Sequence, residues 1–136
     1  MAEVEATRFV ETDPAIVERA LGPGTILEAE GTFDVAAVEE TEDGWRVTGS
    51  GGGLGVPFEF REIEDGYRYE ALGEHGPFRE LEGRLTYAPE NHGTRLTAWS
   101  RVRINLPLQV LTDRIAAWKR RSELARALRT LADEVE

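Results

Sequence analysis

Hydrophobic and polar positions alternate with a period of two up to about residue 104, a pattern typical of β-strands. Residues 3–11 predict a first strand, and residues 31–104 predict a meander of further strands. The clearest alternation puts an apolar side chain at every second position, at Leu54, Val56, Phe58 and Phe60. Turn sequences such as Asp43-Gly44 and Asp65-Gly66 separate the strands, and strands joined by tight turns are antiparallel.

Helical signals interrupt and close this pattern. Asp13 is a good N-cap and Pro14 suits the first helical position, so residues 14–21 predict a short helix that Gly22 ends. Pro23 and Gly24 then break the chain, and residues 25–30 are compatible with a second short helix. From Pro107 a long helix is predicted to run to about Val135, spanning roughly 40 Å at 1.5 Å per residue.

The apolar positions of the long helix occupy two faces, which lie about 120–140° apart at ~100° per residue. The first face holds Leu108, Leu111, Ile115 and Trp118. The second face holds Val110, Ala117, Leu124, Leu128, Leu131 and Val135. A helix gripped by a sheet on one side and covered on the other shows this pattern. A bend of the helix near Arg120, which would turn a single apolar face in a new direction, explains the pattern equally well.

The elements predict one α+β domain over residues 1–136. A curved antiparallel sheet of about seven strands wraps around the long C-terminal helix, with one or two short helices after the first strand. The net charge of −10 makes nucleic acid an unfavourable partner. Lys119 is the only lysine, and an acidic, lysine-poor surface favours a halophilic protein. An acidic protein from a GC-rich genome is the alternative.

Several function classes are excluded or disfavoured. The chain has no cysteine, so disulfides and Cys-based metal sites are excluded. The N-terminus lacks the basic and apolar regions of a signal peptide. No apolar run approaches the ~20 residues of a membrane helix. We therefore expect a cytoplasmic protein without an integral membrane segment.

The order of elements carries a family resemblance over nearly the whole chain. The features that show it are the first strand leading into Thr12-Asp13-Pro14, the long meander, and the segment Asn105-Leu106-Pro107-Leu108 that leads into the helix. The sequence resembles the START-like, or polyketide cyclase (SRPBCC), superfamily, whose helix-grip fold has the same order. The segments 76–97 (GPFRELEGRLTYAPENHGTRLT) and 111–128 (LTDRIAAWKRRSELARAL) look like members found in salt-loving archaea. The resemblance implies a cavity for an apolar molecule more strongly than it implies a reaction.

Three motifs invite a chemical interpretation that their context disfavours. The glycine-rich run 49–55 lacks the Lys-Ser/Thr ending of a phosphate loop and precedes a strand, so we interpret it as a loop at the cavity mouth. His75 and His92 lie in turns without shared-helix spacing, which disfavours a metal site. Close carboxylates near 59–65 and 80–82 are explained by surface solubility in so acidic a chain.

The predicted ligand-binding residues are the large side chains that share inward faces. On the sheet and the helix they are Trp45, Phe58, Phe60, Tyr69, Tyr87, Leu111, Ile115 and Trp118. Each alone is ordinary core, but together they would line an apolar pocket if the sheet stands off the helix. Arg8 faces the cavity if Val4, Ala6 and Val10 point inward, and it is solvated if Phe9 does. The strand pattern leaves both open.

Two surface features suggest partners. Basic residues make the long helix positive within an acidic protein: Lys119, Arg120, Arg121, Arg126 and Arg129. Pairing with carboxylates of the sheet explains them better than docking to anionic headgroups or to an acidic partner. Trp99 is expected to point away from the core, where it marks a dimer or partner contact or packs under a neighbouring arginine.

Three functions remain in order of preference. The first is non-catalytic binding of a hydrophobic or amphipathic small molecule of lipid, isoprenoid or polyketide type. The second is a cyclase or dehydratase that uses a pocket tyrosine or carboxylate as its acid–base group. The third is a protein-interaction module whose cavity is filled by side chains. No cofactor is expected. A pocket with a perturbed tyrosine or carboxylate would favour the enzyme, and a filled core with an exposed apolar patch would favour the module.

Overall fold

The computed structural model describes residues 2–31, 33–51, 54–72, 78–104 and 109–136. Its strands are β1 (Ala2–Val10), β2 (Asp34–Glu40), β3 (Trp45–Gly51), β4 (Leu54–Ile63), β5 (Gly66–Ala71), β6 (Phe78–Glu90) and β7 (Gly93–Ile104). Its helices are α1 (Pro14–Ala20), α2 (Pro23–Glu30) and α3 (Gln109–Val135). Pro23 begins α2 at its first turn, so the predicted second helix starts two residues earlier than expected.

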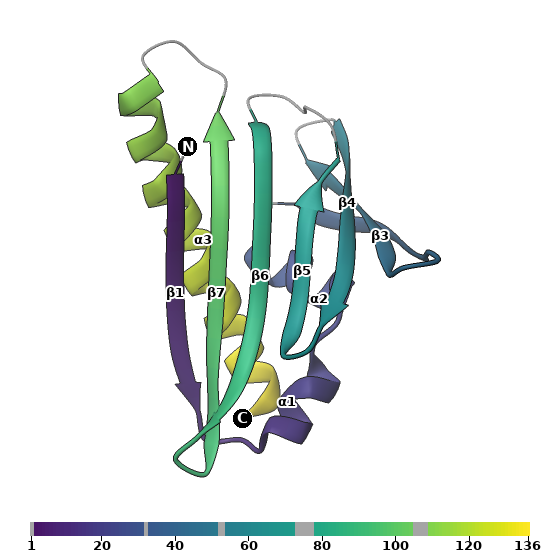
Figure 1. The fold of residues 1–136 in the computed structure, drawn as a ribbon, viewed down its shortest axis with the longest axis vertical. Coiled ribbons are helices and arrows are strands. Elements are labelled where there is room, and N and C mark those ends of the chain that lie inside the picture. The colour runs from purple at the N-terminus through teal and green to yellow at the C-terminus, as the bar shows by residue number, and fades with distance from the viewer. Residues whose placement is uncertain (1, 32, 52–53, 73–77, 105–108) are drawn as a thin grey trace.

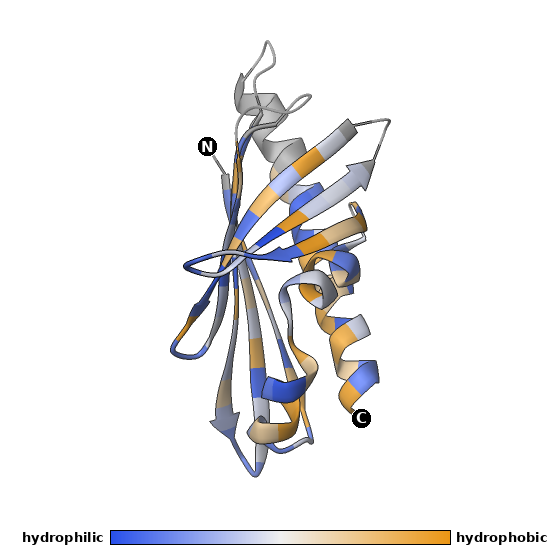
Figure 2. Cartoon of the chain, turned by 90° about the vertical axis from the view of Figure 1, so that its right-hand side faces the viewer, coloured by the Kyte–Doolittle hydropathy of each residue, from blue (hydrophilic) through white to orange (hydrophobic). Residues whose placement is uncertain are grey.

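All strands belong to one antiparallel sheet of seven strands, in the order β1-β7-β6-β5-β4-β3-β2. Strands β2 to β6 each pair with the next strand along the chain, and β1 adds to the free side of β7. The sheet curves, and its three helices lie on the concave side (Figures 1 and 2). Helix α3 packs against β1 and β7, α2 against α3 and β2, and α1 against α3 and β6. This arrangement confirms the predicted α+β architecture.

The core lies between the concave face and the second half of α3. Alternate residues of neighbouring strands point into it, among them Phe58 and Phe60 of β4 and Leu96 of β7. From α3 it receives Leu124, Ala127, Leu128, Leu131 and Ala132. The second predicted face of the helix is therefore the buried one over this half. On the first face, the side chains of Leu108, Leu111 and Ile115 lie outside the described residues.

Local signals at the start of α1 and at the β4–β5 turn act as the sequence predicts. The Asp13 side chain accepts a hydrogen bond of 2.8 Å from the Ala15 amide at the start of α1. Gly66 follows the β4–β5 turn with φ 153°, and a Cβ there would lie 1.9 Å from the Leu85 carbonyl oxygen. Only glycine fits there, so β5 can approach β6 closely where a cleft described below is formed.

Candidate functional site

Three of the predicted wall residues meet at the centre of the concave face. Phe58 and Phe60 are fully buried and Tyr69 is 2% exposed. The Phe60 and Tyr69 rings stack with centroids 4.8 Å apart, and Phe58 meets Tyr69 edge-on at 6.4 Å. These contacts make the three rings part of the packed core beside the second half of α3.

A buried polar cluster crosses this core, which we call the Arg120 cluster: Arg120, Glu30, Tyr69, Ser100 and Glu123. Arg120 binds Glu30 with both ends of its guanidinium, Nη1 to Oε2 at 2.9 Å and Nη2 to Oε1 at 3.0 Å. Its Nη2 also donates to the Tyr69 hydroxyl at 2.7 Å, and its Nε donates to Ser100 Oγ at 2.8 Å. Tyr69 in turn donates to Glu30. The cluster therefore ties α2, α3, β5 and β7 together.

The charges of the Arg120 cluster are stabilised by ion pairs and hydrogen bonds within the protein rather than by water. Burial alone would lower the pKa of Arg120, but its interactions with Glu30, Tyr69 and Glu123 together outweigh burial, so this pKa stands above its usual value. Burial raises the pKa of Tyr69 well above 10, and the charge of Arg120 opposes that shift. Arg120 is thus a cation and Tyr69 a neutral donor at physiological pH. Bidentate geometry of this kind suits arginine and a carboxylate.

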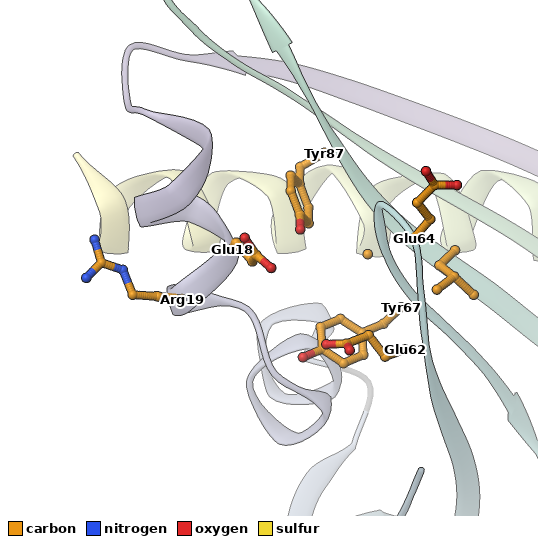
Figure 3. Close-up of a pocket in the computed structure, with 8 residues that line it drawn as sticks. Glu18, Arg19, Glu62, Glu64, Tyr67 and Tyr87 are labelled. Atoms are coloured by element: carbon orange, nitrogen blue, oxygen red, sulfur yellow. The ribbon is translucent and has the colours of Figure 1, made fainter. Parts of the chain in front are cut away.

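An open cleft of about 670 Å³ lies at one end of the concave face, between α1 and the β4–β5 hairpin. We call it the α1 cleft. Its lining residues are Glu18, Arg19, Glu62, Ile63, Glu64, Gly66, Tyr67 and Tyr87. Figure 3 shows the hydroxyl groups of Tyr67 and Tyr87 pointing into the space between α1 and the strands. The cleft combines two phenols with three carboxylates, and so it is polar with aromatic walls.

The α1 cleft continues the aromatic lining of the concave face. Trp45 of β3 meets Tyr67 edge-on with ring centroids 5.8 Å apart. Both side chains are half-buried, as is Tyr87. Two of the predicted wall residues, Trp45 and Tyr87, therefore lie at or beside this cleft, away from the buried Phe60–Tyr69 stack.

The electrostatics of the α1 cleft favour protonated phenols. Burial raises the pKa of Tyr67, and the charges of Glu62 and Glu18 raise it further. Burial likewise raises the pKa of Tyr87, with a smaller contribution from the charge of Glu18. Both tyrosines are therefore neutral hydrogen-bond donors, Tyr67 toward Glu62 and Tyr87 toward Glu18.

These shifts predict an unusual alkaline titration, because Tyr67, Tyr69 and Tyr87 are the only tyrosines in the chain. Absorbance at the tyrosinate band should show none of them ionising near pH 10 in the folded protein. Above that pH the folded state holds more protons than the unfolded state, so the free energy of unfolding should fall as pH rises through 10. A folded-state titration with an ordinary tyrosine pKa would contradict the geometry of the α1 cleft or the Arg120 cluster.

The remaining predicted wall residues fare differently. Trp118 is 71% exposed, so the expectation that it faces the sheet is wrong. Residues two positions apart point in directions that differ by about 200° around a helix axis, so Trp118 lies nearly opposite the buried Arg120. The side chains of Leu111 and Ile115 lie outside the described residues, and their predicted role stays a prediction. Arg8 shares a strand face with the buried Val4 and Val10, but its side chain is exposed.

Most of the other features noted in the sequence lie on the protein surface. Trp99 lies between the guanidinium groups of Arg84 and Arg101, at 5.1 and 5.5 Å, which confirms its packing beside arginine. Glu59 pairs with Arg61 and Glu82 with Arg68, as expected of solvated carboxylates. In the glycine-rich run, residues 49–51 and 54–55 belong to strands, while 52–53 lie outside the described residues. His75 also lies outside them, and His92 is exposed in the β6–β7 turn.

Metal-ligand clusters and membrane-spanning helices are both absent from the described residues. No group of three or more His, Asp or Glu side chains there could hold a metal ion. Within the same ranges, no helix is long and apolar enough to cross a membrane.

Sequence reasoning missed most of the α1 cleft. Alternation could have found Tyr67, because it shares a strand face with Tyr69. Glu62 lay in the carboxylate run that composition alone explained. Nothing in the sequence places Glu18 of α1 opposite the β4–β5 hairpin, since that contact depends on how α1 docks.

Solved structures show the same fold. A START superfamily protein from Mycobacterium smegmatis matches with TM-score 0.68 and 16% identity, covering 98% of this chain and 99% of that one. The di-domain ARO/CYC protein BexL of the BE-7585A biosynthetic pathway matches with TM-score 0.67 and 18% identity, over 98% of this chain and 47% of that one. The protein TTHA0849 from Thermus thermophilus matches with TM-score 0.63 and 23% identity, over 98% and 95%.

These likenesses define the class of fold. The chain has the START-like helix-grip fold, as the order of its elements predicted. No family model and no curated protein matches its sequence.

Proposed function

We propose that this protein binds an amphipathic small molecule on the concave face of its sheet, with the α1 cleft as one end of the binding site. The observation that carries the proposal is the cleft itself, about 670 Å³ in volume and walled by Tyr67 and Tyr87. That volume is in the range of small-molecule sites. The two hydroxyl groups would orient a polar end, and the rings and Trp45 would cover an apolar body.

The proposed ligand has a body of lipid, isoprenoid or polyketide type. The fold supports this, since similar structures include a START superfamily protein and an ARO/CYC protein of a biosynthetic pathway. The polar lining of the cleft favours an amphipathic compound over a purely apolar one, because burying its phenols and carboxylates against hydrocarbon would be unfavourable.

The test is mass spectrometry of organic extracts from the purified protein. The wild type should carry a small molecule that is absent from the Tyr67→Ala/Tyr87→Ala variant. Trp118→Ala is the matched control, because it removes an exposed aromatic side chain far from the buried face of α3. If wild type and cleft variant carry the same compound, or neither carries any across several expression hosts, the proposal fails.

A cyclase or dehydratase is the second candidate, and the raised pKa of each cleft tyrosine beside a carboxylate favours it. A phenol with a raised pKa holds its proton at neutral pH and can serve as a hydrogen-bond donor or a general acid. Incubating the extracted compound with wild type and Tyr87→Phe separates the candidates. A new product formed only by the wild type would favour the enzyme, and an unchanged compound would favour the carrier.

A further inference from the structure

The carboxylates of the α1 cleft lack the arginine partners that several carboxylates of the sheet have. Glu59 and Glu82 are each within 3.0 Å of an arginine, and Glu90 pairs with Arg95 at 2.8 Å. The cleft's own Glu18, Glu62 and Glu64 form no ion pair with any residue in the described ranges. Negative charge in the cleft is therefore not neutralised by a guanidinium group, although Tyr67 and Tyr87 hydrogen-bond to Glu62 and Glu18.

The one basic residue of the lining does not offset this charge. Arg19 Nε donates to the Ala15 carbonyl of its own helix at 3.3 Å. Figure 3 shows its guanidinium directed away from Tyr67 and Tyr87. Counting formal charges, the lining has three carboxylates against one guanidinium that faces elsewhere.

Two aromatic rings stand beside these carboxylates. The faces of Tyr67 and Tyr87 carry the negative charge of the π-system, which attracts ammonium groups. A concave site focuses such a potential, and the net charge of −10 adds a long-range attraction for cations and repels anionic amphiphiles. Fatty acids and other carboxylates are therefore the wrong partners for this cleft.

We infer that the ligand of the α1 cleft is a cationic amphiphile, with an ammonium head among Glu18, Glu62, Tyr67 and Tyr87 and an apolar tail directed toward Trp45. The inference rests on the proposed function and assigns its ligand a charge. The carboxylates pair with the ammonium head and the rings attract it, while no group of three or more acidic or histidine side chains in the described residues is placed to hold a metal ion instead.

The test is calorimetric titration with three probes that share one tail: octyltrimethylammonium, octanol and octanoate, each below its micellar concentration. Octyltrimethylammonium should bind about tenfold more tightly than octanol, and octanoate should bind more weakly than either. Raising the KCl concentration should weaken the binding of octyltrimethylammonium, leave that of octanol nearly unchanged and relieve the repulsion of octanoate.

Charge-matched variants localise the effect. Glu18→Gln/Glu62→Gln should abolish the preference for the cation. Glu59→Gln/Glu90→Gln changes the net charge equally at arginine-paired positions away from the cleft and should leave the preference intact. An equal loss in both variants would overturn the inference, because it would assign the preference to overall charge.

The results distinguish failure of the proposed charge selectivity from failure of the proposed binding site. If all three probes bind with equal affinity, the proposed small-molecule site stands and its charge selectivity is wrong. If none binds, both the site and its selectivity fail. Should the cleft variant lose its far-ultraviolet circular dichroism signal, the salt dependence of the wild type decides alone: a preference for the cation that KCl does not reduce overturns the inference.

Discussion

Replacing Arg120 with methionine is expected to destabilise the fold by about 3–5 kcal/mol, because it leaves the carboxylate of Glu30 buried without its cation. Arg120 and Glu30 side chains are each 3% exposed, so water does not screen their interaction. Methionine fills a similar volume, which confines the effect to charge and hydrogen bonding. Urea denaturation followed by circular dichroism measures the change in the free energy of unfolding.

The matched control is Arg121→Met, one residue further along α3 at an exposed position, which should change stability little. Adding Glu30→Gln to Arg120→Met should recover part of the loss, because it removes the unpaired charge. A loss no larger than that of the control would show that the cluster contributes nothing to stability.

The sequence predicted the faces of the strands better than the partners of the charges. Alternation placed Phe58, Phe60 and Tyr69 inward, and all three are buried. It could not reveal the Arg120 cluster, whose central ion pair joins Glu30 and Arg120, 90 residues apart. Arginine and glutamate are normally solvated. Only the docking of α2 on α3 brings these two together away from water.

Helical periodicity misassigned one side chain for a related reason. A stripe through Leu111, Ile115 and Trp118 is as regular as the stripe through Leu124, Leu128 and Leu131. The structure buries the second stripe and exposes Trp118. Hydropathy gives the angle between two stripes but does not say which faces the sheet when both are apolar. A charged residue, Arg120, lies on the buried side and obscures the pattern there.

Gly83→Ala is the second substitution expected to have a large effect. Gly83 of β6 pairs with Tyr69 of β5, and the Tyr69 ring lies across the glycine. A Cβ at Gly83 would stand 2.2 Å from Tyr69 Cζ and 2.4 Å from its hydroxyl oxygen. Such overpacking costs about 1–3 kcal/mol of unfolding free energy and would displace the hydroxyl that Arg120 and Glu30 share. Thermal or urea denaturation measures the loss.

Gly55→Ala is the matched control, since Gly55 is an exposed strand glycine whose added Cβ would meet only Thr48 Cγ2, at 3.9 Å. That change should be neutral or slightly stabilising, because alanine loses less backbone entropy than glycine. The decisive measurement repeats Gly83→Ala in the Tyr69→Ala background, where the ring is gone. If the loss there is much smaller, Gly83 is present to make room for the phenol that completes the Arg120 cluster. If the loss is the same, the strand backbone itself requires glycine, and the placement of Tyr69 must have another cause.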